Sequence, residues 1–78
     1  MSTFYIYGRE GCGNCVQAQA KVRRGGGVFE YLSYDDHEDT LKAEHDNIPR
    51  SLPVIIHEGE AVLFATLDPY LRKVKSKG

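Results

Sequence analysis

The sequence predicts an α/β domain in which three helices cover a mixed sheet of four strands, in the order β-α-β-α-β-β-α. Short runs rich in aromatic and β-branched residues, typical of strands, alternate with segments whose apolar residues recur at helical spacing. A β-α-β unit forms a right-handed crossover with parallel strands, whereas a tight turn between the last two strands makes them antiparallel. The sheet is therefore expected to be mixed.

The first strand is expected at residues 3–7, which are rich in aromatic and branched side chains. A helix follows after a short glycine-containing loop, because a mostly apolar stripe recurs at helical spacing from Cys12 onward. The members of this stripe are Cys12, Cys15, Val16, Gln19 and Ala20. We expect the helix to end at Arg23 and Arg24, since basic groups suit the negative end of the helix dipole and three glycines follow.

The middle of the chain predicts a second strand, at residues 28–34, and a short second helix. The helix is expected to start in the acidic segment at Asp35 and to be ended by Pro49. Its apolar face would carry Leu41, His45 and Ile48.

The last third of the chain predicts a hairpin and a third helix. Residues 54–56 and 60–64 are expected to pair as antiparallel strands around a tight turn at Glu58 and Gly59. Asp68 is expected to be the N-cap of the last helix, with Pro69 at its first position. The apolar stripe of this helix is Leu67, Tyr70, Leu71 and Val74.

Length and composition narrow the class of protein. A chain of 78 residues forms one domain, spanning 1–78, and its formal net charge of -1 argues against a general nucleic-acid binder. No run approaches the roughly 20 apolar residues of a membrane span, and the first residues lack the basic and long apolar regions of a secretion signal. We therefore expect a protein that binds neither nucleic acid nor membranes, and we also expect a monomer.

The two cysteines, Cys12 and Cys15, are three positions apart. Small secreted domains stapled by disulfides carry more cysteines, spread along the chain, and a pair this close closes almost no loop. We therefore expect the pair to carry chemistry in a reducing, cytoplasmic compartment. Half of a zinc site and a pair of inert cysteines stay as alternatives. No metal site is expected, because His37, His45 and His57 lack the paired spacing of zinc ligands.

The stretch Cys12-Gly13-Asn14-Cys15 opens the predicted first helix, which is the placement that thiol chemistry needs. The thiolate is the reactive form of cysteine, and a free thiol is mostly protonated at neutral pH. Unpaired backbone N–H groups and the positive end of the helix dipole favour a negative sulfur at Cys12. Cys15 lies one turn further, on the apolar side. We expect Cys12 to attack a substrate disulfide and Cys15 to release the resulting mixed disulfide.

Pro53 directly precedes the third predicted strand, where it cannot donate a ladder hydrogen bond. A cis bond before it would turn the backbone of Leu52 outward beside the sulfurs, where an extended substrate could pair with it. Residue physics alone favours a trans bond, because most X-Pro bonds are trans.

On these residues the chain resembles the glutaredoxins, a family with the thioredoxin-like fold. Residues 7–15, which read YGREGCGNC, are similar to the strand end, basic residue and CxxC motif of the family. Residues 51–54, which read SLPV, are similar to its Thr-Val-Pro segment, whose proline is cis. The resemblance implies a minimal thioredoxin-like fold, a cis bond before Pro53, thiol–disulfide oxidoreductase activity, and glutathione as a co-substrate with no bound cofactor.

The resemblance also implies a glutathione site. Arg9 would face the glycine carboxylate of glutathione, and the backbone of Leu52, next to Pro53, would pair with its cysteinyl part. Asp68 would bind the γ-glutamyl ammonium. The backbone N–H groups of Leu67 and Asp68 would bind the γ-glutamyl carboxylate at a helix start, which suits an anion.

Two departures from the family pattern leave three functions open. Ala65 and Thr66 replace two glycines where the backbone approaches glutathione, and Gly13 and Asn14 replace Pro-Tyr between the cysteines. The first function is glutathione-coupled reduction of protein disulfides or glutathione mixed disulfides. The second is a thioredoxin-like hydrogen donor, for example to ribonucleotide reductase, that thioredoxin reductase re-reduces. The third is a binding module that uses the fold for docking or carries an iron–sulfur cluster through Cys12 and glutathione; the second cysteine argues against it.

Overall fold

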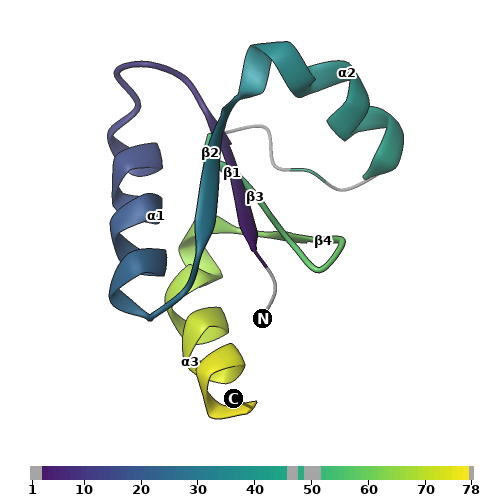
Figure 1. Cartoon of the computed structure of the whole chain (residues 1–78). Coiled ribbons are helices and arrows are strands. Elements are labelled where there is room, and N and C mark those ends of the chain that lie inside the picture. The colour runs from purple at the N-terminus through teal and green to yellow at the C-terminus, as the bar shows by residue number, and fades with distance from the viewer. Residues whose placement is uncertain (1–2, 46–47, 49–51, 78) are drawn as a thin grey trace.

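The structure is a computed structural model that describes residues 3–45, 48 and 52–77. The elements follow the predicted order, and their bounds are β1 Phe4–Gly8, α1 Gly13–Arg24, β2 Phe29–Ser33, α2 Tyr34–Glu44, β3 Val54–His57, β4 Glu60–Val62, the 3₁₀ turn η1 Phe64–Thr66, and α3 Leu67–Lys77. The chain therefore has the minimal thioredoxin-like layout that the sequence predicts (Figure 1).

The four strands form one mixed sheet in the order β2-β1-β3-β4. Strands β1 and β2 run parallel, whereas β3 runs antiparallel to both β1 and β4. The hairpin between β3 and β4 turns at Glu58 and Gly59, whose φ angles are 52° and 79°. Two successive positive φ values are the requirement of the two-residue turn that matches the twist of a hairpin. The predicted tight turn is confirmed.

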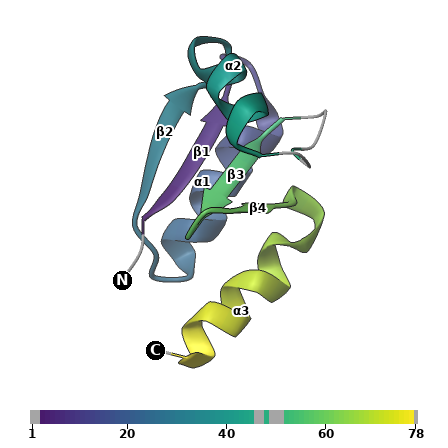
Figure 2. The ribbon, with the colours of Figure 1, turned by 90° about the vertical axis from the view of Figure 1, so that its right-hand side faces the viewer.

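The helices cover both faces of the sheet, because successive side chains of a strand point to opposite sides. Helices α1 and α3 pack on one face, where the core consists of Phe4, Ile6, Ala18, Val22, Ile55, Val62 and Leu67. Helix α2 packs on the other face, where the core consists of Tyr34, Leu41, Val54 and Ile56. Figure 2 shows α2 in front of the sheet and α1 behind it.

Helix α2 differs from its predicted bounds at both ends. Tyr34, expected at the end of a strand, opens the helix instead. Its side chain is buried with that of Leu41, seven positions later, and residues at this spacing lie on one face of a helix. The helix ends at Glu44, so His45 has an extended backbone and does not lie on the helical face as predicted. Pro49, the expected end, lies outside the described residues.

Two predictions for the remaining elements are also wrong. The buried face of α1 consists of Cys15, Ala18 and Val22, whereas Val16 is 63% exposed and Ala20 is exposed. The packing of α1 against the sheet therefore selects one of two adjacent stripes of small and apolar residues. Strand β4 ends at Val62, so its last two expected residues lie outside it: Leu63 precedes η1 and Phe64 begins it. Among the described residues, no helix combines the length and the apolar character needed to cross a membrane.

Candidate functional site: a disulfide at the start of helix α1

Cys12 and Cys15 form a disulfide at the N-terminus of α1, with their Cα atoms 5.2 Å apart. Cys12 is the N-cap residue, with φ -85° and ψ 103°, and its sulfur accepts a hydrogen bond from the backbone N–H of Cys15 at 3.1 Å. This is the position in which an N-cap side chain satisfies an unpaired helical donor. A sulfur held there is stabilised as a thiolate by the N–H group and by the helix dipole.

The two sulfurs differ in exposure. Cys12 is half-buried, whereas Cys15 has an exposed fraction of 0%. Strand β1 and helix α1 create this difference, because β1 ends beside the first turn of α1 and covers the inward-facing Cys15. The pair is compatible with redox exchange in which one sulfur is reached from solvent and the other is reached through the first.

Gly8, the last residue of β1, provides the space in which Cys15 lies. A Cβ atom at this glycine would lie 2.5 Å from the Cys15 sulfur, 2.6 Å from the Tyr31 hydroxyl oxygen and 3.0 Å from the Cys15 Cβ. The first two contacts are closer than real Cβ atoms tolerate. The absence of a side chain at Gly8 is therefore a condition for the burial of Cys15.

We expect Gly8→Ala to lower the free energy of unfolding of the oxidised protein by about 1–3 kcal/mol, the usual cost of inserting a carbon into a packed site. Urea unfolding, followed by far-UV circular dichroism, measures this change. Gly13→Ala is the matched control, because a Cβ at Gly13 meets nothing within 4 Å. It should keep or raise the stability, since alanine favours a helix over glycine. Equal stability of Gly8→Ala and the wild type would contradict the close packing at Gly8.

The segment Leu52-Pro53 lies at the same end of the sheet as the cysteines. Tyr7 of β1 pairs with Val54 of β3 in antiparallel register, so the next pair of positions places Pro53 opposite Gly8. The bond between Leu52 and Pro53 is cis, as the resemblance implies, and Pro53 is fully buried while Leu52 is half-buried. Ser51, which belongs to the same predicted segment, lies outside the described residues.

Arg9 also lies at this end, in the loop between β1 and α1, where its carbonyl accepts a hydrogen bond from the backbone N–H of Cys12. Its guanidinium group binds the carboxylate of Asp35. Nε donates to both carboxylate oxygens at 3.1 Å, and Nη2 donates to Oδ1 at 2.8 Å. The hydrogen bond from Arg9 holds the pKa of Asp35 below its usual value, and the same bond raises the pKa of Arg9. Both side chains are exposed, so this ion pair is open to competition from a ligand carboxylate.

Asp68 and Leu67 occupy a different part of the molecule. The prediction that Asp68 is the N-cap of the last helix is wrong, because α3 already begins at Leu67 and continues from η1. The backbone N–H of Leu67 donates to the carbonyl of Phe64, and the side chain of Leu67 is fully buried. The turn η1, which has no side-chain cap at Leu63, thus leads directly into α3.

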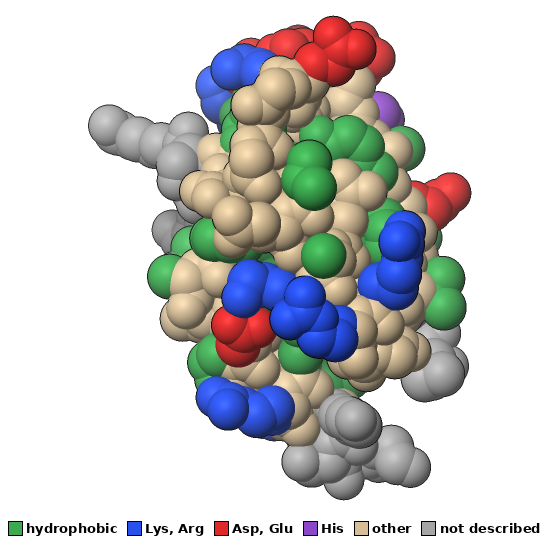
Figure 3. Space-filling model, turned by 90° about the vertical axis from the view of Figure 1, so that its left-hand side faces the viewer, with side chains coloured by type: hydrophobic (Ala, Val, Ile, Leu, Met, Phe, Trp, Pro, Cys, Tyr) green, Lys and Arg blue, Asp and Glu red, His purple; other side chains and the backbone are tan. Residues whose placement is uncertain are grey.

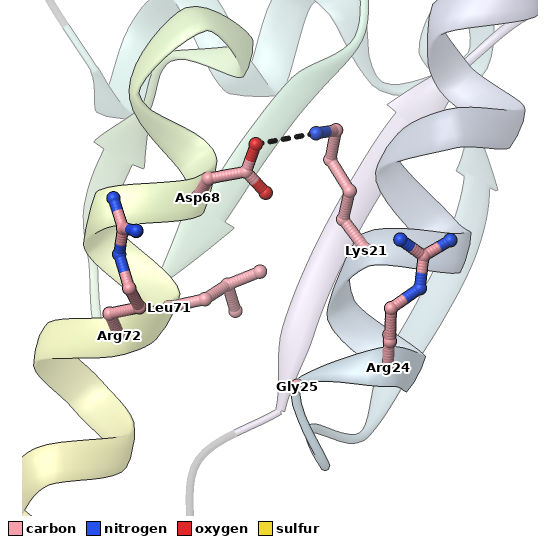
Figure 4. A pocket seen from close by; sticks show the side chains of 6 residues that line it. All are labelled: Lys21, Arg24, Gly25, Asp68, Leu71 and Arg72. Atoms are coloured by element: carbon pink, nitrogen blue, oxygen red, sulfur yellow. Dashed lines mark hydrogen bonds and ion pairs between the residues drawn. The ribbon is translucent and has the colours of Figure 1, made fainter.

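The carboxylate of Asp68 pairs with the ammonium group of Lys21 at 2.6 Å (Figure 4). Lys21 follows Cys12 by nine positions on α1, which corresponds to about 13 Å along the helix axis. The two residues line a basic groove between α1 and α3 together with Arg24, Gly25, Leu71 and Arg72. Figure 3 shows Lys and Arg side chains gathered around an acidic one on this face. The structure therefore brings Arg9, Leu52 and Pro53 to the cysteines, and places Asp68 in the groove.

Tyr31 and Asp35 lie at the site, although their sequence context does not single out either as a site residue. Tyr31 pairs with Ile6 in the parallel register of β1 and β2, and its hydroxyl donates to the carbonyl of Arg9 at 3.2 Å. The hydroxyl thereby reaches the space above Gly8. The only sequence signal for Tyr31 is an aromatic residue in the middle of the second strand, and strand aromatics are too common for this pattern to identify a site.

Among the described residues, no group of three or more His, Cys, Asp or Glu side chains could hold a metal ion. Comparison of the chain with models of protein families, with curated proteins and with solved structures finds no match.

Proposed function

We propose that the protein is a thiol–disulfide oxidoreductase of the glutaredoxin type that uses glutathione as its reductant. The observation that carries this proposal is the asymmetry of the cysteine pair. The Cys12 sulfur caps helix α1 and accepts an N–H hydrogen bond at 3.1 Å, whereas Cys15 is fully buried one turn below. Attack by an accessible thiolate, followed by resolution from a protected thiol, needs this division of roles.

The proposed reaction is a pair of thiol–disulfide exchanges. The Cys12 thiolate attacks a substrate disulfide, so that a Cys12–substrate bond forms and the first substrate sulfur leaves as a thiolate. Cys15 then loses its proton and attacks the Cys12 sulfur, which releases the second substrate thiolate and closes the Cys12–Cys15 disulfide. Two glutathione molecules reduce this disulfide and leave as glutathione disulfide. Each departing thiolate takes a proton from water.

Two features at the cysteine end support glutathione as the reductant. The Arg9 guanidinium is exposed and already holds a carboxylate, that of Asp35, in a geometry that a glycine carboxylate could adopt. The backbone of Leu52 lies beside a buried proline opposite Gly8, where the cysteinyl part of glutathione would extend.

A second candidate function is a thioredoxin-like hydrogen donor to a protein such as ribonucleotide reductase. The placement of Asp68 favours it, because its carboxylate is paired with Lys21 and the N–H of Leu67 is bound to Phe64. Both groups are thus engaged within the chain, and the γ-glutamyl end of glutathione would have to displace Lys21 to reach the Asp68 carboxylate.

One coupled assay separates the two functions. The oxidised protein is given NADPH with either glutathione and glutathione reductase or thioredoxin reductase, and the consumption of NADPH is followed. Turnover with the glutathione system supports the first function. Re-reduction by thioredoxin reductase alone supports the second and rules out the first. A coloured, iron-containing protein would instead indicate the cluster-carrying module.

We expect Arg9→Gln to raise the KM for glutathione by about two- to fivefold, because an exposed ion pair contributes up to about 1 kcal/mol. The matched variant Asp35→Asn should lower the KM, since it frees the Arg9 guanidinium from its internal partner. Asp68→Asn should leave the KM within about twofold, because Asp68 lies in the groove between α1 and α3. Initial rates at varied glutathione concentration measure all three. An unchanged KM for glutathione in Arg9→Gln would show that Arg9 does not bind glutathione.

A further inference from the structure

Cys15 faces a chemical difficulty in the proposed reaction. It must become a thiolate to attack the mixed disulfide, and it must leave as a thiolate when a reductant attacks Cys12. Its side chain has an exposed fraction of 0%, and burial disfavours the charged form of a thiol. A hydrogen-bond donor beside the sulfur would relieve this cost.

The structure places the hydroxyl group of Tyr31 near the Cys15 sulfur. A Cβ built at Gly8 would lie 2.5 Å from the sulfur and 2.6 Å from the Tyr31 hydroxyl oxygen, so the sulfur and this oxygen lie no more than 5.1 Å (2.5 Å plus 2.6 Å) apart. No side chain at Gly8 separates them. The nearby amide of Gln19 donates to the Cys15 carbonyl and not to the sulfur.

The Tyr31 hydroxyl forms only a weak hydrogen bond when the two cysteines are joined as a disulfide. Its hydrogen bond to the neutral carbonyl of Arg9 is 3.2 Å long, which is longer than the usual distance of about 2.5–3.0 Å for an O–H donor. A thiolate is a charged acceptor, and hydrogen bonds to charged groups are roughly twice as strong as neutral ones. When Cys15 carries a negative charge, the hydroxyl forms a stronger hydrogen bond by turning from the Arg9 carbonyl to the Cys15 sulfur.

We propose that Tyr31 is a positioning residue of the redox site, whose hydroxyl donates a hydrogen bond to the Cys15 thiolate during the exchange. This inference rests on the proposed function and extends it to the second cysteine. In resolution, the Cys15 proton passes to water, the Cys15–Cys12 bond forms and the Cys12–substrate bond breaks. In reduction, the reductant sulfur bonds to Cys12 and the Cys15 sulfur leaves with the bonding electron pair. The Tyr31 hydroxyl stabilises the same thiolate in both directions.

The test is Tyr31→Phe, which removes only the hydroxyl from a side chain that is 41% exposed. The rate at which dithiothreitol reduces the oxidised protein should fall by about ten- to a hundredfold, the effect of losing a hydrogen bond to a charged group. Tyr5→Phe is the matched control, because Tyr5 is 38% exposed on the same sheet and lies next to Ile6, so its side chain points to the other face. It should leave the rate unchanged. Tyr31→Met serves as a second variant without a donor if the phenylalanine variant does not fold.

A double-variant experiment separates this role from a structural one. In the Cys15→Ser background, only Cys12 acts on a glutathionylated peptide, so adding Tyr31→Phe should change that rate by less than about twofold. An equal loss with and without Cys15 would assign Tyr31 a structural role and overturn the inference. If the wild type exchanges disulfides and Tyr31→Phe does so at the same rate, the inference about Tyr31 is overturned and the proposed function stands. A wild-type protein inactive with every disulfide and reductant would overturn the proposed function instead.

Discussion

Cys12→Ser is expected to abolish disulfide exchange completely, with glutathionylated peptides and with protein disulfides alike. The Cys12 sulfur is the half-buried member of the pair and the one that caps α1. A serine hydroxyl in the same place also accepts the N–H bond of Cys15, so the helix start is retained, but the hydroxyl is not ionised at neutral pH and does not attack disulfides. The remaining thiol, Cys15, is fully buried and out of reach of the substrate.

The measurement is NADPH consumption in the coupled assay that supports the wild-type protein. The far-UV circular dichroism of the variant should match that of the reduced wild-type protein, which shows that the loss is chemical. Ser33→Ala is a suitable control, because Ser33 also precedes a helix, α2, but forms no side-chain capping bond there. Measurable exchange by Cys12→Ser would mean that Cys15 attacks, and the assignment of roles would be reversed.

Cys15→Ser is expected to abolish the reduction of protein disulfides but to preserve the reduction of glutathionylated peptides. Reduction of protein disulfides should be lost, because no second sulfur resolves the mixed disulfide on Cys12. The mixed disulfide itself should then accumulate as a covalent complex, visible on a non-reducing gel and released by dithiothreitol. Reduction of a glutathionylated peptide should continue, since a second glutathione can take the place of Cys15.

The same variant gives a check on the reductant. If glutathione supplies the electrons, raising its concentration should restore the rate of the Cys15→Ser variant on glutathionylated peptides. If the protein acts only as a thioredoxin-like donor, the variant should be inactive on every substrate and should still form the covalent complex. The absence of any trapped complex, despite an active wild type, would contradict the resolving role of Cys15.

The basic groove between α1 and α3 shows that a role implied for Asp68 by a sequence resemblance depends on where the fold places that residue. Asp68 follows the expected pattern in the sequence, but β4 has only three residues and η1 carries the chain directly into α3. Helix α3 consequently starts beside Lys21, about nine residues along α1 from the disulfide. The packing of α3 beside α1, and not the identity of Asp68 alone, places this carboxylate next to Lys21.

Local interactions account for what could be predicted from the sequence. The order of elements follows from periodicities within short windows, and the hairpin turn follows from the backbone freedom of Gly59 beside Glu58. The placement of Cys12 at a helix start requires only that a strand and loop precede an amphipathic segment. Each of these depends on residues a few positions apart, whose interactions are similar in any fold.

The tertiary structure alone decided which groups meet at the site. The pairing of Arg9 with Asp35, the choice of Ala18 and Val22 as the buried stripe of α1, and the approach of Tyr31 to Cys15 over Gly8 all join elements that are distant in sequence. These contacts depend on strand register and on how each helix is rotated against the sheet. Both are determined by the packing of the whole core, which no local pattern of residues contains.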